Sequence, residues 1–195
     1  MMNNISERIA DSLVNAGAAP LEDKALYEYG IRQGILLVIN IATAVLIGLV
    51  LGMFWQSIIF LLAYNPVRTY SGGYHARTAL ACYLLSIPMM LFVLLGIKML
   101  PWNGYICAIA LLCSVVIIVV LAPVADPNKP LNEKEKIVYK GKARTYTAVF
   151  FGAALMLWVV GMRQVSLSIM MALGVAAVML VLGTIKNGNM RKEKA

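Results

Sequence analysis

Charged residues are scarce in this 195-residue chain: 13% are Asp, Glu, Lys or Arg, whereas 61% are hydrophobic. The mean hydropathy of +0.80 is far above that of a soluble domain, in which apolar residues make up roughly half. The composition therefore excludes a soluble globular protein and predicts an integral membrane protein. Since a spanning helix uses about 20 apolar residues, the chain has room for about six spans and none for a separate soluble catalytic domain.

Histidine and cysteine are also rare, with one His and three Cys in the whole chain. This set is too small for the three or four protein ligands of a zinc site, so no metal or other cofactor is expected. The odd number of cysteines argues against a disulfide framework. Cys107 and Cys113 lie in an apolar run and are expected to be packing residues.

The apolar runs predict an all-α membrane domain of about six transmembrane helices. Its second span, 53–64, is about 12 residues long and is expected to be partly re-entrant or to end inside protein. The expected order is N-terminal amphipathic or cytoplasmic helices at 1–33, a helical hairpin at 35–64, a catalytic cytoplasmic loop at 65–78, a second hairpin at 79–124, a basic cytoplasmic loop at 125–146, a third hairpin at 147–185 and a basic tail at 186–195.

Basic residues outnumber acidic ones by 17 to 9, and their distribution predicts the orientation. With six spans, every Lys and Arg except Lys98 and Arg163 falls on one side, which the positive-inside rule identifies as cytoplasmic. Both termini are then cytoplasmic. Removing the short second span would break this segregation. Since membrane topology accounts for the basic residues, the net charge of +8 does not call for a nucleic-acid partner.

The N-terminal segment carries an apolar stripe, formed by Ile5, Ile9, Leu13 and Ala16. Its charged residues lie on other faces of the helix that this spacing predicts. A helix lying in the membrane interface and a helix packed in the cytoplasm explain the pattern equally well.

The histidine and one cysteine lie close together in the sequence, at His75 and Cys82, near one membrane face. A neighbouring imidazole or cation favours the nucleophilic thiolate, so the pair is the minimum equipment of a cysteine peptidase or acyltransferase. On one unbroken helix the two would be about 10 Å apart, which is beyond hydrogen-bond reach. The chain must therefore fold back between them. Gly72 and Gly73 permit this and are candidate amide donors to an oxyanion.

A solvated histidine and a packing cysteine are the ordinary explanation for such a pair. The surrounding loop favours chemistry, because it combines Arg68 and a glycine pair with His75 and Cys82 and contains no acid. Asn65 and Asp126 are candidates for a third residue that orients the histidine, and a dyad without one is the remaining alternative.

A second polar stretch is strongly basic, with Lys129, Lys134, Lys136, Lys140, Lys142 and Arg144. Positive-inside topology and contact with anionic lipids explain most of these charges. The same field would also attract an acidic peptide, so binding of a substrate tail and binding of membrane lipids are both expected.

The segment Arg68-Thr69-Tyr70-Ser71-Gly72-Gly73-Tyr74-His75-Ala76, followed by Cys82, resembles the accessory gene regulator B (AgrB) family of membrane peptidases in bacterial peptide quorum sensing. Chain length, hydropathy layout and the basic second loop agree with this resemblance. It implies that Cys82 is the nucleophile and His75 its base, and that Arg68 and Gly73 support activity. It also implies a bacterial cell-membrane location, an AgrD-like precursor peptide with an acidic C-terminal tail as substrate, and a homodimer.

The resemblance further implies a two-step reaction. Cys82 attacks the carbonyl that joins the signal segment to the tail, and the tail leaves behind a thioester. A thiol or hydroxyl of the peptide then closes a thiolactone or lactone ring. Two other classes of protein compete with this peptidase: a small peptide transporter, and a noncatalytic membrane adaptor that binds an acidic partner through its basic loop.

Overall fold

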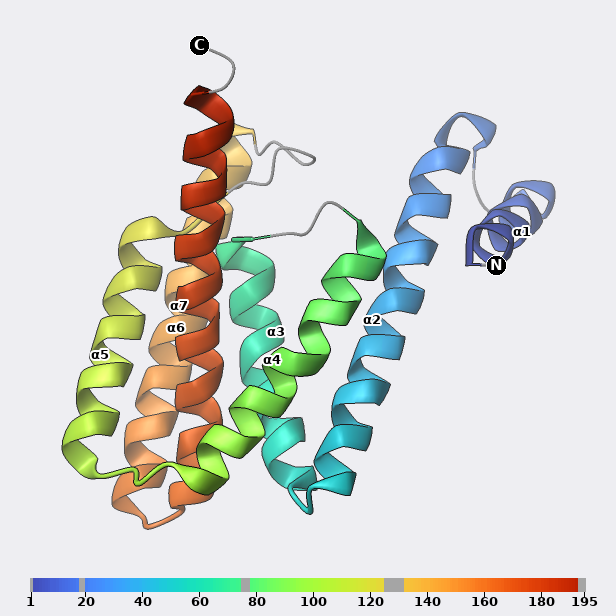
Figure 1. The fold of residues 1–195 in the computed structure, drawn as a ribbon. Helices are drawn as coiled ribbons and strands as arrows, with labels where there is room; N and C mark the ends of the chain where they lie inside the picture. The colour runs from blue at the N-terminus through green and yellow to red at the C-terminus, as the bar shows by residue number, and fades with distance from the viewer. Residues whose placement is uncertain (1, 18–19, 75–77, 125–131, 193–195) are drawn as a thin grey trace. The chain divides into compact units, whose positions relative to one another are not determined.

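The computed structural model describes residues 2–17, 20–74, 78–124 and 132–192. This part of the chain forms seven α-helices and one short 3₁₀ helix and contains no β-strand, which confirms the all-α prediction (Figure 1). The chain divides into two compact units, residues 1–44 and 45–195.

The first unit contains α1 (Met2–Asn15), the 3₁₀ helix η1 (Leu21–Asp23) and most of α2 (Lys24–Val50). An ion pair of 2.5 Å between Lys24 and Asp11 joins α2 to α1. On α1, Ala10 is fully buried while Ile9, on the predicted apolar stripe, is 42% exposed. The predicted boundary near residue 34 lies inside α2, because the polar residues before Gly34 continue the same helical hydrogen bonding.

The second unit is a bundle around the C-terminal helix. Its helices are α3 (Phe54–Ser71), α4 (Ala79–Met99), α5 (Gly104–Leu121), α6 (Glu133–Val159) and α7 (Arg163–Lys192). Helix α7 packs against α3, α5 and α6, and less extensively against α4. Ala172, Ala176 and Ala177 let neighbouring backbones approach α7, while Leu173 and Leu180 fill the core.

Buried hydroxyls in this bundle bond to backbone carbonyls. Thr147 donates to the Ala143 carbonyl one turn earlier on α6. Ser166 donates from α7 to the Ala154 carbonyl of α6 at 2.7 Å. The second bond ties two helices together where side-chain hydrogen bonds face little competition from water.

Three helices extend beyond the boundaries expected from hydropathy. Helix α3 continues through Pro66 to Ser71, so its last two turns occupy the beginning of the segment predicted as a loop from residue 65. Helix α6 begins at Glu133, within the predicted basic loop, and α7 continues past residue 185. The residues at these ends are largely polar yet remain helical, which apolar runs alone cannot predict.

Four helical segments of the described chain are long and apolar enough to cross a membrane: Leu21–Val50, Leu80–Met99, Gly104–Leu121 and Arg163–Gly188. Helices α3 and α6 do not belong to this set. Four of the six predicted spans are therefore supported by length and composition.

Candidate active site at the end of α3

The candidate site begins where α3 ends and the glycine pair crosses the bundle. Gly72 forms a parallel bridge with Val124, which follows α5. Val124 N–H donates to the Ser71 carbonyl at 2.9 Å, and Gly73 N–H donates to the Val124 carbonyl at 3.3 Å. Tyr74 N–H then donates to the Met179 carbonyl of α7 at 2.8 Å. Two elements distant in sequence thus hold the backbone up to the residue before His75.

Glycine is required at both positions of the pair. Gly72 has φ 72° and ψ −146°, a region that is essentially restricted to glycine, and Gly73 has φ 120°. A Cβ on Gly72 would collide with the Val124 carbonyl oxygen. A Cβ on Gly73 would lie 2.7 Å from the Met179 carbonyl oxygen. The pair therefore serves both backbone conformation and close approach.

Arg68, in the last turn of α3, binds the backbone of this segment. Its half-buried guanidinium donates to the carbonyls of Gly72 and Tyr74. The planar guanidinium can satisfy several acceptors at once, which a lysine cannot do with the same geometry. Arg68 thus fixes the shape of the segment that leads to His75.

The amides of the glycine pair, the candidate oxyanion donors, both make backbone hydrogen bonds in this structure. Gly72 N–H already donates to the Arg68 carbonyl at 3.1 Å, and Gly73 N–H is bonded to Val124. Both amides are used to build the segment because the chain must turn sharply at the end of α3.

Cys82 lies in the first turn of α4 and is half-buried. Thr78 caps this helix: its hydroxyl accepts from Ala81 N–H at 3.2 Å, and its carbonyl accepts from Cys82 N–H at 3.0 Å. Helix N-termini favour negatively charged groups, thiolates included. Tyr64 of α3 lies near both Arg68 and Cys82.

Several predicted site residues lie outside the described part of the chain: His75, Asp126 and Lys129. Asn65, the other candidate third residue, lies on α3, where its carbonyl accepts a hydrogen bond from the Thr69 hydroxyl. The three cysteines are free thiols; Cys107 is buried and Cys113 is exposed on α5.

From Glu133 on, the basic stretch is helical, and it contacts the segment before the glycine pair through an aromatic cluster that sequence reasoning missed. The Tyr70 ring stacks on Tyr146 at a centroid distance of 5.4 Å and meets Tyr139 edge-on at 5.6 Å. The Lys142 ammonium lies 4.9 Å from the Tyr70 ring centroid. Two residues before the glycine pair, the chain is therefore anchored to α6. The Tyr139–Tyr146 spacing of seven on one helix is the signal that could have suggested a shared face.

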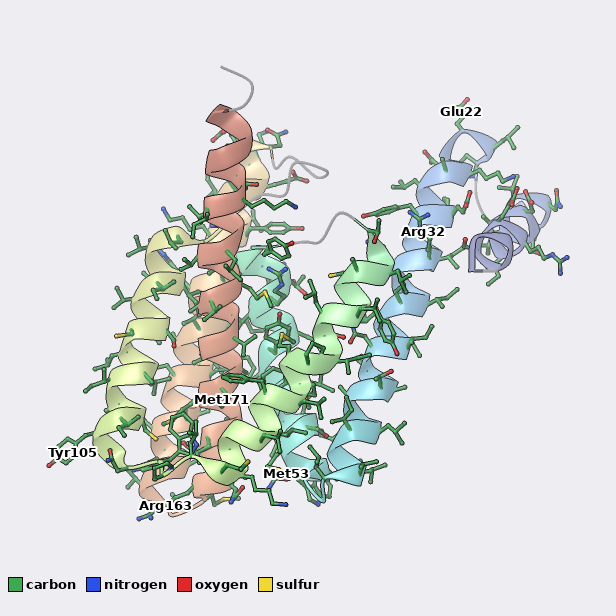
Figure 2. All side chains as sticks on the ribbon, viewed as in Figure 1. Glu22, Arg32, Met53, Tyr105, Arg163 and Met171 are labelled. Atoms are coloured by element: carbon green, nitrogen blue, oxygen red, sulfur yellow. The ribbon has the colours of Figure 1, made fainter. Side chains whose placement is uncertain are left out.

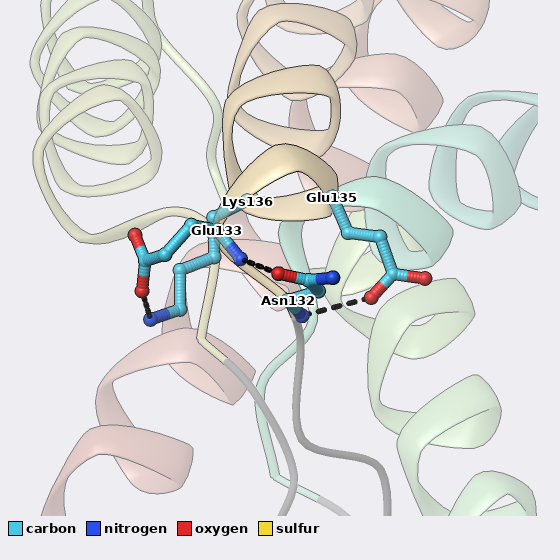
Figure 3. A network of polar contacts seen from close by, with 4 residues as sticks. All are labelled: Asn132, Glu133, Glu135 and Lys136. Carbon is cyan, nitrogen blue, oxygen red and sulfur yellow. Dashed lines mark hydrogen bonds and ion pairs between the residues drawn. The ribbon is translucent and has the colours of Figure 1, made fainter.

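The start of α6 is fixed by a capping box (Figure 3). The Asn132 side chain accepts from Glu133 N–H at 2.7 Å, and Glu135 accepts from Asn132 N–H at 2.9 Å. Lys136 pairs with Glu133 at 2.6 Å, and Arg144 donates to the Val119 carbonyl at 3.3 Å. The basic residues at 134, 136, 140, 142 and 144 are all exposed.

In the described part of the chain, which is all-α, four helical segments are long and apolar enough to span a membrane, and these features define a membrane protein. A family model described as accessory gene regulator B, AgrB, matches residues 6–183. The chain belongs to this family. Membership supports a part in processing quorum-sensing peptides.

Individual relatives agree with the family match. The chain is 29% identical over 160 residues to AgrB-like protein 2 of Clostridium perfringens strain 13, covering 77% of this chain and 75% of the relative. It is 27% identical over 156 residues to an AgrB-like protein of Listeria welshimeri serovar 6b, covering 78% and 76% of the two chains. No solved structure matches this chain.

Proposed function

We propose that this protein is a membrane cysteine endopeptidase that removes the C-terminal tail of an AgrD-like precursor and promotes closure of a thiolactone or lactone ring. One observation carries the proposal: the half-buried Cys82 stands in the first turn of α4, while Arg68 fixes the backbone of Tyr74, which directly precedes His75. The proposed nucleophile thus lies on a capped helix, and the backbone that leads to the proposed base is held up to Tyr74.

In this reaction His75 takes the proton from the Cys82 thiol, and the thiolate attacks the carbonyl carbon before the tail. The C–N bond breaks, the tail amine leaves with the proton from the imidazolium, and an acyl thioester remains on Cys82. The thiol or hydroxyl of the signal segment then attacks the thioester. The Cys82 sulfur leaves, regains a proton, and the product is a ring formed without consuming water.

The basic N-terminal half of α6 suits an acidic tail in this scheme. Lys134, Lys140 and Lys142 are exposed on it, and Lys142 also contacts Tyr70, two residues before the glycine pair. A tail carboxylate bound there would lie beside the segment that leads to His75. Anionic headgroups of membrane lipids would be attracted by the same charges.

We further propose six spans in a single membrane domain, with both termini and the active site on the cytoplasmic side of the bacterial membrane, and a homodimer as the functional state. The packing of α3 and α6 along α7 supports the two additional spans, because helices packed on a spanning helix share its depth. The turns after Val50, Met99 and Val159 lie at one end of the second unit, where Figure 2 labels Met53 and Arg163. Lys98 and Gln164 line one cavity with Met53 at this end, away from the basic N-terminal half of α6.

The test uses the full-length protein in lipid nanodiscs with the AgrD-like precursor of the same organism, and intact-mass spectrometry. The expected result is an adduct equal in mass to the precursor minus its tail, absent in Cys82→Ala and present in the matched control Cys113→Ala. His75→Ala should slow tail release by on the order of 10²-fold or more. Binding of the precursor without adduct or tail release would overturn the peptidase proposal in favour of an adaptor or a transporter.

A further inference from the structure

The segment before His75 rests on one residue of α7 that no catalytic motif includes. Gly183 is buried, and a Cβ added to it would lie 2.5 Å from the Gly73 carbonyl carbon, 2.7 Å from Tyr74 N and 2.8 Å from Gly73 Cα. All three are backbone atoms, which cannot rotate away as a flexible side chain would. The segment can therefore lie this close to α7 only because Gly183 has no side chain.

This close approach makes a specific hydrogen bond possible. Tyr74 N–H donates at 2.8 Å to the Met179 carbonyl, one helical turn before Gly183. On the other side, Arg68 donates to the Tyr74 carbonyl. The peptide groups on both sides of Tyr74 are therefore held, one by α7 and one by α3. The Lys186 ammonium, 5.1 Å from the Tyr74 ring centroid, adds a contact from the next turn of α7.

We infer that Gly183 is a positioning residue for catalysis: by letting the backbone of Gly73 and Tyr74 lie against α7, it sets the place from which His75 reaches Cys82. This inference rests on the proposed function. Alanine favours helix by about 1 kcal/mol over glycine, so Gly183→Ala should not weaken α7 itself. Its effect should fall on the segment against the helix.

The test measures alkylation of Cys82 by iodoacetamide between pH 6 and pH 10 in a Cys107→Ala, Cys113→Ala background, where Cys82 is the only thiol. Gly174→Ala, on the same helix as Gly183, is the matched control, since a Cβ there meets nothing closer than the Ser114 hydroxyl of α5 at 3.7 Å. We expect Gly183→Ala to slow alkylation at pH 7 by about tenfold or more, with little effect at pH 10. The variant should reach the rate of His75→Ala, and Gly174→Ala should match the parent.

Combining the variants separates positioning from a general structural effect. If Gly183 acts through His75, Gly183→Ala has no further effect in a His75→Ala background. An equal additional loss there, or alkylation of Gly183→Ala at the parent rate, overturns the inference while the peptidase proposal stands. If His75→Ala itself alkylates like the parent, the dyad and the positioning role are both overturned.

Discussion

Substitution of Gly72 by alanine tests whether the bridge to Val124 organises the candidate site. The new Cβ would collide with the Val124 carbonyl oxygen, and the backbone at φ 72° and ψ −146° is unfavourable for alanine. The conformation costs about 1–3 kcal/mol. Relieving the collision breaks the two hydrogen bonds between Val124 and the residues on either side of Gly72, each worth about 1 kcal/mol. The segment should therefore lose about 3–5 kcal/mol of local stability.

Hydrogen–deuterium exchange in nanodiscs measures this loss at the Gly73 and Tyr74 amides. An opening free energy lowered by 3–5 kcal/mol, as estimated above, accelerates their exchange by on the order of 10²-fold or more. Gly52→Ala is the matched control: Gly52 also has a positive φ, 69°, but a Cβ there meets nothing within 4 Å. It should cost only about 1–2 kcal/mol, confined to its own turn. Unchanged exchange at Gly73 and Tyr74 in Gly72→Ala would refute the reasoning.

Two further predictions concern the anchoring of the segment on α6. Tyr70→Ala should destabilise the second unit by about 2–3 kcal/mol, because two ring contacts and one cation–π contact are lost. Tyr70→Phe keeps the ring and should stay within about 0.5 kcal/mol. Unfolding in mixed micelles measures both, and equal losses would contradict the packing argument. Asn132→Ala should remove the capping box, destabilise α6 by about 1 kcal/mol and speed amide exchange at residues 133–136. Lys134→Ala, at an exposed position, should leave that exchange unchanged. Protection that persists in Asn132→Ala would show that the cap is not needed.

Hydropathy predicted where the apolar helices lie but not where several helices end. The hairpin at 35–64 requires a turn before its second span at residue 53, and the structure has one at Gly52, which has a positive φ. The end of α3 was missed because helical hydrogen bonding continues through polar residues until Gly72 stops it. The start of α6 had a readable signal, since Asn132 followed by Glu135 three residues later is a capping-box pattern.

The candidate site was predictable only as a local motif. Arg68 and the glycine pair stand out in the sequence, but their partners do not. Val124 and Met179 contribute backbone atoms, which have no residue-type signature. Gly183 looks like any other glycine of a membrane helix until its distance to Tyr74 is known. The bond from Gly73 N–H to the Val124 carbonyl was hidden for the same reason, because its acceptor comes from a distant part of the chain.

The packing of α4 bears on how water is kept from the proposed thioester. Beyond Pro88, α4 buries Met90, Val93, Leu94 and Ile97, whereas Leu85, one turn after Cys82, is 46% exposed. Pro88 has no N–H, so the Leu84 carbonyl lacks its usual helical partner between the two halves. Among the described residues, the half of α4 that carries Cys82 is thus less tightly packed than the half beyond Pro88.

Ring closure prevails over hydrolysis of the thioester only where water is excluded. The apolar side chains beside Cys82 should therefore decide whether the product is cyclic or linear. We expect Leu85→Gln to raise the fraction of linear acid over cyclic product, with tail release largely retained, because the thioester still forms but water reaches it. Leu95→Gln is the matched control, as Leu95 is 39% exposed on the same helix beyond Pro88. Mass spectrometry of the released peptides gives the ratio. An unchanged ratio in Leu85→Gln would mean that water exclusion at Cys82 does not depend on this face of α4.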